Sequence, residues 1–210
     1  MCSIIGSFNK DVIVDLVKLN LYRGQHSYSY SYYDPKTKII TYMRKDLGSI
    51  PVEDILVPEG QYCIAHMQAP TTDNKSFNSI HPAIYGPSQS CLWHNGIVKD
   101  LCVKDMMKGL KETNSWDTYL ILKQFEMQRT LNGIDGTFSC LYYKAEEGLK
   151  LFRNEISPMF FDNDFNISST KFDNSQSLEP NIVWNFIPGE CIINESTFTT
   201  VENPYFFMDV

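Results

Sequence analysis

The sequence predicts an α+β protein, with helices between two sets of antiparallel strands. Strict period-two alternation appears early, where Tyr28, Tyr30 and Tyr32 alternate with serines. Helix-like segments follow near the middle, and the second half is rich in short apolar runs separated by Gly, Asn, Asp and Pro. The chain has 210 residues, 43% of them hydrophobic, which is enough for one large core. We therefore expect a single domain over residues 1–210.

The N-terminal part is expected to form strands joined by short turns. An Asp34-Pro35 turn separates the alternating strand from its hairpin partner. One helix is expected between the first two strands, at residues 11–21. The expected strands cover residues 3–8, 27–33, 38–44 and 61–67.

The middle and the end of the chain predict two helices followed by several strands. Residues 69–90, rich in Pro, Thr, Asn and Ser, predict a long loop, and the apolar segment 90–100 follows it. The second helix has Ser115 as a plausible N-cap. The expected helices cover residues 103–112 and 115–131, and the expected strands 136–143, 148–154, 158–162, 165–169, 181–187, 190–195 and 197–201.

Charge and cysteine usage narrow the class of protein. A formal net charge of −7 without any basic run argues against nucleic acid as a partner. Neither a secretion signal nor an apolar window of membrane-spanning length is present in the sequence, so we expect no membrane association. The six cysteines (Cys2, Cys63, Cys91, Cys102, Cys140 and Cys191) contain no C-x-x-C pair and predict reduced thiols in a cytoplasmic protein.

Cys2 directly follows the initiator methionine. A cysteine commonly packs as a small buried hydrophobe, which is one explanation of its position. The other explanation is chemical: removal of Met1 would leave a thiol nucleophile and an α-amine base on one residue.

Four segments of the chain, read together, carry a family resemblance. In order they resemble the glutaminase domain of class II glutamine amidotransferases, which are N-terminal-nucleophile hydrolases. Five further segments resemble the same family collinearly, so the resemblance covers nearly the whole chain and implies a four-layer αββα sandwich of two antiparallel sheets. The four main segments are "MCSIIGSF", "YRGQHSYS", "IAHMQAPTTDNKSFNSIHP" and "LWHNGIVKD", and the others are "SWDTYLIL", "NGIDGTFSCLYY", "LKLFRNEISPMFF", "FNISST" and "FIPGECIIN".

The resemblance implies a hydrolase mechanism that proceeds through a thioester. Cys2 would attack the side-chain amide of glutamine, with its own α-amine as base and then as acid toward ammonia. Asn95 and Gly96 match the pair of oxyanion donors in the family. Read without the family, Asn-Gly between apolar runs is a strong hairpin-turn signal.

Other matches imply residues that shape the site or bind the substrate. Arg23 matches a site-shaping arginine, although an arginine before Gly24 also suits a surface turn. Asp117 matches the acid that receives the substrate α-ammonium group, and an acid also favours the first turn of a helix. His66, His81 and His94 match family positions and are expected to support the site by hydrogen bonding; neither a metal nor a cofactor is expected.

The motif around residues 66–81 departs from the family pattern. Gln68 stands where the resemblance expects an arginine that binds the substrate carboxylate, Thr72 replaces a histidine, and Thr71 keeps its match. A neutral amide cannot replace a bidentate guanidinium. The expected substrate-binding residues are Gln68, Thr71, Thr72, His81 and Asp117.

This departure leaves three hypotheses open. The first is a glutaminase with rewired carboxylate recognition, for which Lys75 lies in the same loop. The second is an amidohydrolase for a γ-glutamyl or other amide without a free carboxylate. The third is a binding or regulatory protein that retains the fold.

The resemblance also suggests a protein partner. Family members usually join this domain to a synthase that consumes ammonia, and no P-loop or pyrophosphate-binding motif is found here. We therefore expect a stand-alone domain that passes ammonia to a separate synthase, or hydrolysis for its own sake. The aromatic segment 204–208 is the expected docking surface.

Overall fold

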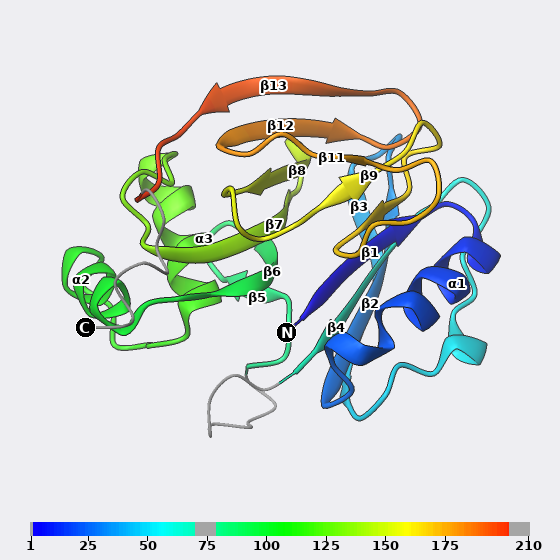
Figure 1. Ribbon diagram of the computed structural model, residues 1–210, viewed down its shortest axis with the longest axis horizontal. Coiled ribbons are helices and arrows are strands. Elements are labelled where there is room, and N and C mark those ends of the chain that lie inside the picture. Colours follow the sequence, from blue (N-terminus) through cyan, green and yellow to red (C-terminus); the bar gives the residue numbers. More distant parts are fainter. Residues whose placement is uncertain (1, 70–78, 202–210) are drawn as a thin grey trace.

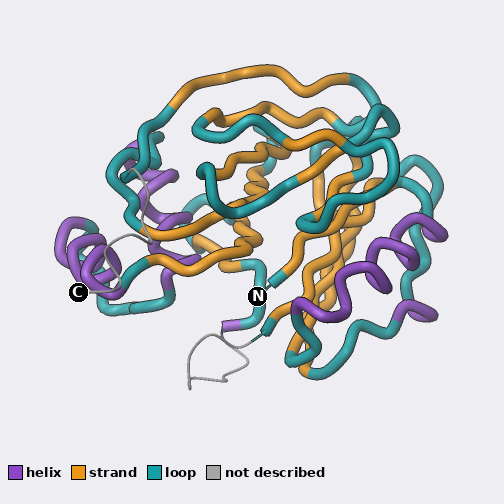
Figure 2. The backbone as a smooth tube through the Cα atoms, in the orientation of Figure 1, coloured by secondary structure: helices purple, strands orange, loops and turns teal. Residues whose placement is uncertain are grey.

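Two antiparallel sheets stack face to face and are covered by helices on both outer sides, as the computed structural model of the chain shows (Figures 1 and 2). The structure describes residues 2–69 and 79–201. The expected four-layer αββα sandwich is confirmed. No helix among these residues is long and apolar enough to cross a lipid bilayer.

The first sheet has seven strands in the order β11-β9-β10-β1-β4-β2-β3, with α1 (Lys10–Asn20) on its outer face. Ile13, Leu16 and Val17 of this helix pack against the sheet. The strands are β1 (Ser3–Ser7), β2 (Ser27–Asp34), β3 (Ile39–Leu47), β4 (Tyr62–Gln68), β9 (Phe160–Phe161), β10 (Ile167–Ser168) and β11 (Gln176–Ser177).

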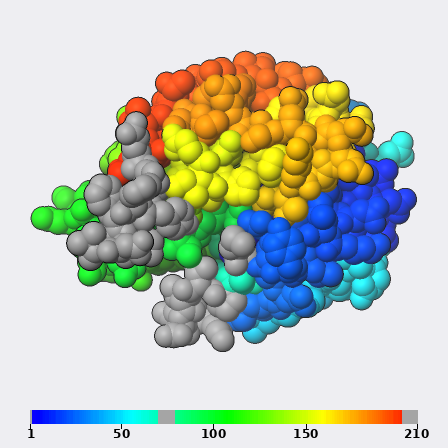
Figure 3. Space-filling view, viewed as in Figure 1, coloured from blue at the N-terminus to red at the C-terminus, as the bar shows by residue number. Residues whose placement is uncertain are grey.

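The second sheet has six strands in the order β13-β12-β8-β7-β6-β5 and carries α2 (Asp100–Gly109) and α3 (Asp117–Gln128). Figure 3 shows the C-terminal residues, orange to red, along the upper edge of the molecule. The strands are β5 (Ala83–Tyr85), β6 (Ser90–Val98), β7 (Gly136–Lys144), β8 (Gly148–Arg153), β12 (Ile182–Ile187) and β13 (Cys191–Thr197).

The alternation in β2 explains how the two sheets come together. Its tyrosines belong to the core beneath α1, so its serines face the other sheet. Trp93 of β6 is fully buried between the sheets and donates its indole N–H to Ser29 Oγ at 3.3 Å. Small serines on this face leave room for the large ring, and the hydroxyl satisfies its only polar atom.

Some predicted boundaries differ from the structure. Helix α3 begins at Asp117 rather than after Ser115, because Asn114 accepts the backbone N–H of Trp116 in a turn that precedes the helix. Helix α2 begins three residues earlier than expected, at Asp100. The predicted loop 69–90 contains β5.

The strand predicted at residues 197–201 is wrong beyond Thr197, where β13 ends. Phe198 stacks on Phe138 with ring centroids 5.9 Å apart and belongs to the core beneath α2 and α3. The backbone N–H of Thr199 then donates to Asn132 Oδ1 at 2.8 Å. This segment is held by loop contacts instead of a sheet partner.

Arg153, at the end of β8, is a buried cation that binds backbone oxygens. Its Nε donates to the Leu178 carbonyl at 2.5 Å and its Nη1 to the Asn154 carbonyl at 2.9 Å. The side chain therefore joins β8 to the segment that precedes β12. Burial lowers the pKa of Arg153, and these hydrogen bonds offset the cost of placing the charge inside.

Replacing Arg153 by methionine is expected to lower the free energy of unfolding by about 3 kcal/mol or more, because several buried carbonyls lose their donor. Urea denaturation measures the change. Arg44→Met is the matched control: Arg44 pairs with Asp54 at a partly exposed site, and its loss is expected to cost less than about 1 kcal/mol. Equal losses in the two variants would contradict this assignment.

Candidate active site

Cys2 lies immediately before β1, where the two sheets face each other. Its side chain is 5% exposed, and Sγ donates a weak hydrogen bond to the Ala69 carbonyl at 3.8 Å. Burial raises the pKa of the Cys2 thiol to about 11; the contact with the Ala69 backbone and the charge of Arg23 oppose this rise, whereas Asp117 adds to it. The thiol is therefore neutral near pH 7 and needs a base to become a nucleophile.

Arg23 fixes the backbone of Cys2. It ends the short 3₁₀ helix Leu21–Arg23 after α1, is buried, and donates from Nε to the Cys2 carbonyl at 2.9 Å. Because Arg23 is buried, the alternative explanation that it lies in a surface turn is wrong. Gly24 follows it, and a Cβ there would lie 2.4 Å from the Ala69 nitrogen. Only glycine allows this close approach between the Arg23 turn and the end of β4.

Asn95 and Gly96 lie inside strand β6 rather than at a hairpin turn. They pair with Ser139 and Phe138 of β7, and β6 packs across the sandwich on β1. A Cβ on Gly96 would lie 1.9 Å from the Thr137 carbonyl oxygen, so this position requires glycine. The turn explanation of the Asn-Gly pair is therefore wrong.

The side-chain amide of Asn95 is an unusual feature of this strand. Asn95 is 3% exposed, and within the described part of the chain its Nδ2 has no hydrogen-bond partner. A buried donor without a partner costs about 1–3 kcal/mol, and such groups are rare in native proteins. An acceptor supplied by a ligand would remove this cost.

Asp117 occupies the first turn of α3. Its Oδ1 accepts from the Thr118 backbone N–H at 2.7 Å and its Oδ2 from the Val98 N–H at 3.2 Å. The helix N-terminus stabilises the carboxylate, as the sequence suggested. The same charge raises the pKa of the Cys2 thiol, so the acid lies within electrostatic reach of the nucleophile.

A cluster of three buried histidines lies behind these residues. Thr118 Oγ1 is 3.0 Å from both His81 Nε2 and His94 Nδ1, and the rings of His66 and His81 stack with centroids 4.2 Å apart. Burial lowers the pKa of His66 to about 3 and the pKa of His81 well below its ordinary value, so both rings are neutral. Sequence reasoning overlooked Thr118; its position directly after Asp117 at a helix start was the available signal.

Gln68, at the end of β4, is held by three protein partners. Its Nε2 donates to the Ser79 carbonyl at 3.1 Å. Its Oε1 accepts from Ser27 Oγ at 3.2 Å and lies 3.1 Å from His81 Nδ1. Because a carbonyl can only accept, the Ser79 contact sets the orientation of the amide and makes His81 Nδ1 the donor.

Several sequence predictions concern residues outside the described ranges. Thr71, Thr72 and Lys75 belong to this group, as do Met1 and the segment 204–208. The described members meet from both sheets: Cys2, Arg23 and Gln68 belong to the first sheet and its turns, whereas Asn95, Gly96 and Asp117 belong to the second sheet and its helix.

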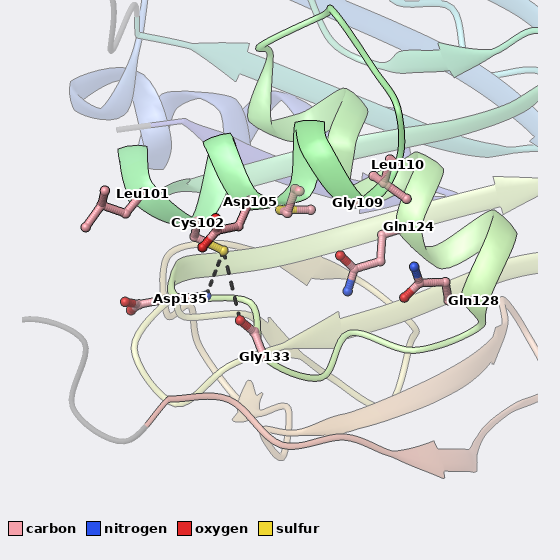
Figure 4. A pocket seen from close by; sticks show the side chains of 10 residues that line it. Leu101, Cys102, Asp105, Gly109, Leu110, Gln124, Gln128, Gly133 and Asp135 are labelled. Atoms are coloured by element: carbon pink, nitrogen blue, oxygen red, sulfur yellow. Dashed lines mark hydrogen bonds between the residues drawn. The ribbon is translucent and has the colours of Figure 1, made fainter.

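A separate hollow lies between α2, α3 and the loop that precedes β7 (Figure 4). Its volume is about 370 Å³, and Cys102 Sγ there accepts the Asp135 backbone N–H at 3.3 Å. None of the described site residues lines it. Cys102 therefore belongs to a different part of the molecule.

Comparisons with known proteins support the fold. No protein-family model matches the chain, and no curated protein matches its sequence. The structure is similar to that of glutamine phosphoribosylpyrophosphate (PRPP) amidotransferase from B. subtilis complexed with ADP and GMP, with a TM-score of 0.67 and 15% identity over 93% of this chain and 49% of the other. It is equally similar to a structure described as the allosteric regulatory enzyme of purine biosynthesis, with TM-score 0.67 and 15% identity over 93% of this chain and 48% of that one. The chain spans about half the length of these structures and shares their fold, the four-layer αββα sandwich that the sequence predicted.

Proposed function

We propose that the chain is an amidohydrolase that cleaves the side-chain amide of glutamine, or a related primary amide, with Cys2 as nucleophile. The buried Asn95 amide without a described partner carries this proposal. It lies on the strand packed against β1, which begins directly after the buried Cys2 thiol. A donor held in a dry site on the other sheet is what stabilisation of an oxyanion requires.

The proposed reaction begins after Met1 is removed. An α-amine with a pKa of about 7.7–8.0 accepts the proton of the Cys2 thiol, and Sγ forms a bond to the amide carbon. The Asn95 Nδ2–H and the Gly96 backbone N–H bind the negative oxygen of the tetrahedral intermediate. Collapse breaks the C–N bond, and the α-ammonium returns its proton to the leaving ammonia. Water then hydrolyses the thioester to a carboxylic acid and restores the thiol.

Arg23 acts as a positioning residue in this proposal. Its hydrogen bond to the Cys2 carbonyl fixes the backbone from which both the thiol and the amine project. Asp117 is proposed to bind the α-ammonium group of the substrate, because its Oδ2 accepts the Val98 N–H and has a second lone pair for a further donor, whereas Oδ1 accepts from the N–H and the hydroxyl of Thr118. A separate protein that consumes the released ammonia is the proposed partner.

Three measurements on the purified protein test this function. Intact mass is expected to show the loss of one methionine, glutamine is expected to yield ammonia, and a glutamine-derived diazoketone is expected to label Cys2 stoichiometrically. Cys2→Ser is expected to abolish both labelling and ammonia release. The matched control is Cys191→Ser, at a half-buried thiol on β13, which should behave as the unmodified sequence does. A retained Met1 together with no labelling would instead leave a binding protein that keeps this fold.

A further inference from the structure

The charges around the proposed nucleophile point to a particular class of substrate. We propose that the reacting amide belongs to a molecule with a free α-ammonium group and a capped α-carboxyl group, such as a glutamine residue at the N-terminus of a peptide. This inference rests on the proposed function and specifies its substrate.

One acid and one arginine are the described side chains whose charges act on the Cys2 thiol. The acid, Asp117, has a side chain that is 21% exposed and suits a cation. The arginine, Arg23, uses Nε on the Cys2 carbonyl, and its Nη1 lies 3.3 Å from the Tyr22 hydroxyl. Arg23 therefore binds the backbone of the nucleophile. Asp117 is the charged side chain that we assign to the substrate, as an acceptor for its α-ammonium group.

The residue at the expected carboxylate-binding position carries no charge. Gln68 is a neutral amide whose orientation is set by Ser79, Ser27 and His81. The ring that touches it, His81, is held neutral because burial lowers its pKa well below the ordinary value. The described surroundings of Gln68 thus offer hydrogen bonds without positive charge.

The described lysine whose charge acts on His81 is Lys45 of β3. Its Nζ donates to the Pro82 carbonyl at 2.9 Å, and burial lowers its pKa. This ammonium group is held by the backbone carbonyl of Pro82, the residue after His81. A substrate carboxylate placed near Gln68 would therefore lie in the same site as the Asp117 charge without a described counter-charge. An amide or peptide bond at that position removes the repulsion and still presents a carbonyl and an N–H.

Three small substrates separate the two charged groups of glutamine. They are glutamine itself, its α-methylamide, which keeps the ammonium but lacks the carboxylate, and N-acetylglutamine, which keeps only the carboxylate. Each contains one primary amide, so ammonia reports side-chain cleavage alone. We expect kcat/KM for the α-methylamide to exceed that for glutamine by at least about tenfold, and N-acetylglutamine to be the poorest substrate.

Variants at Asp117 and Gln68 test whether these two residues cause the preference for the α-methylamide. Asp117→Asn is expected to lower kcat/KM for both ammonium-bearing substrates and to reduce their ratio, because it also removes the charge that repels the carboxylate of glutamine. Gln68→Arg, which adds a carboxylate-binding cation, is expected to reduce or reverse the ratio, whereas the neutral control Gln68→Met should leave it above one. Circular dichroism checks that each variant is folded.

The outcomes are distinguishable from a failure of the proposed function. If none of the three amides yields ammonia and the diazoketone leaves Cys2 unlabelled, the proposed function fails and this inference fails with it. If glutamine is hydrolysed as well as or better than its α-methylamide, the function stands and the inference is overturned. If Lys75→Ala then abolished glutamine hydrolysis, Lys75 would be the residue that binds the substrate α-carboxylate.

Discussion

Replacing Asn95 by alanine is expected to lower kcat for amide hydrolysis by about 10²- to 10³-fold with little change in KM, the usual effect of removing one oxyanion donor. The reason is that Nδ2 has no described hydrogen-bond partner in the resting site, so the substrate oxygen competes with no described protein acceptor for this donor. Steady-state kinetics with glutamine or its α-methylamide measures the change.

Two further measurements separate this catalytic effect from a structural one. Thermal unfolding of Asn95→Ala is expected to occur at or above the temperature of the unmodified sequence, because the variant removes a buried unsatisfied donor. Asn95→Asp keeps the size of the side chain but replaces the donor with a charged acceptor, and is expected to be slower than the alanine variant. An equal loss of stability and activity in Asn95→Ala would assign Asn95 to packing instead.

Acidification from pH 6.5 to 4.5 is expected to remove roughly 5 kcal/mol of stability through His66 and His81 alone. Both are neutral in the folded protein because burial lowers their pKa values, to about 3 for His66. In the unfolded chain each takes up a proton below a pKa of about 6.5. The unfolded state then holds more protons, so stability present above pH 6.5 is lost as the pH falls, by about 1.4 kcal/mol per pH unit for each histidine.

Urea denaturation at several pH values between 7 and 4.5 measures this slope. His66→Gln is expected to halve it, whatever its effect on stability at pH 7. In the folded protein, the ring resonances of His66 and His81 should not titrate over the same range. A shallow slope with both rings titrating near pH 6 would contradict the burial assigned to them.

The strands were predictable wherever the sequence alternates or stays apolar over the length of a whole strand. Residues 27–33 and 61–67 alternate or run apolar for a whole strand, and the structure has β2 and β4 within one residue of those limits. Residues 197–201 have the same β-forming composition but end outside a strand. Phe198 packs beneath α2 and α3, a tertiary contact that no local pattern contains.

The candidate site, like the fold, was only partly predictable from the sequence. Cys2, Asn95 and Asp117 could be named from motifs, because each motif fixes residue types at a short spacing. Thr118 could have been noticed beside Asp117, but its contacts could not be predicted, since its hydroxyl meets two rings from other elements, on β6 and before β5. The three partners of Gln68 likewise come from two separate segments, Ser27 on β2 and Ser79 and His81 before β5, and meet only after folding.

The nucleophile and the proposed oxyanion donors belong to different sheets, so their separation depends on the spacing between the two sheets. His66 Nε2 spans that spacing to the His94 carbonyl at 3.1 Å, and Trp93 spans it to Ser29. A substitution deep in this interface, far from any reacting atom, would move the thiol relative to Asn95 by whatever amount the layers part. Substitutions between the two sheets should therefore lower the rate of hydrolysis before they lower stability enough to unfold the protein.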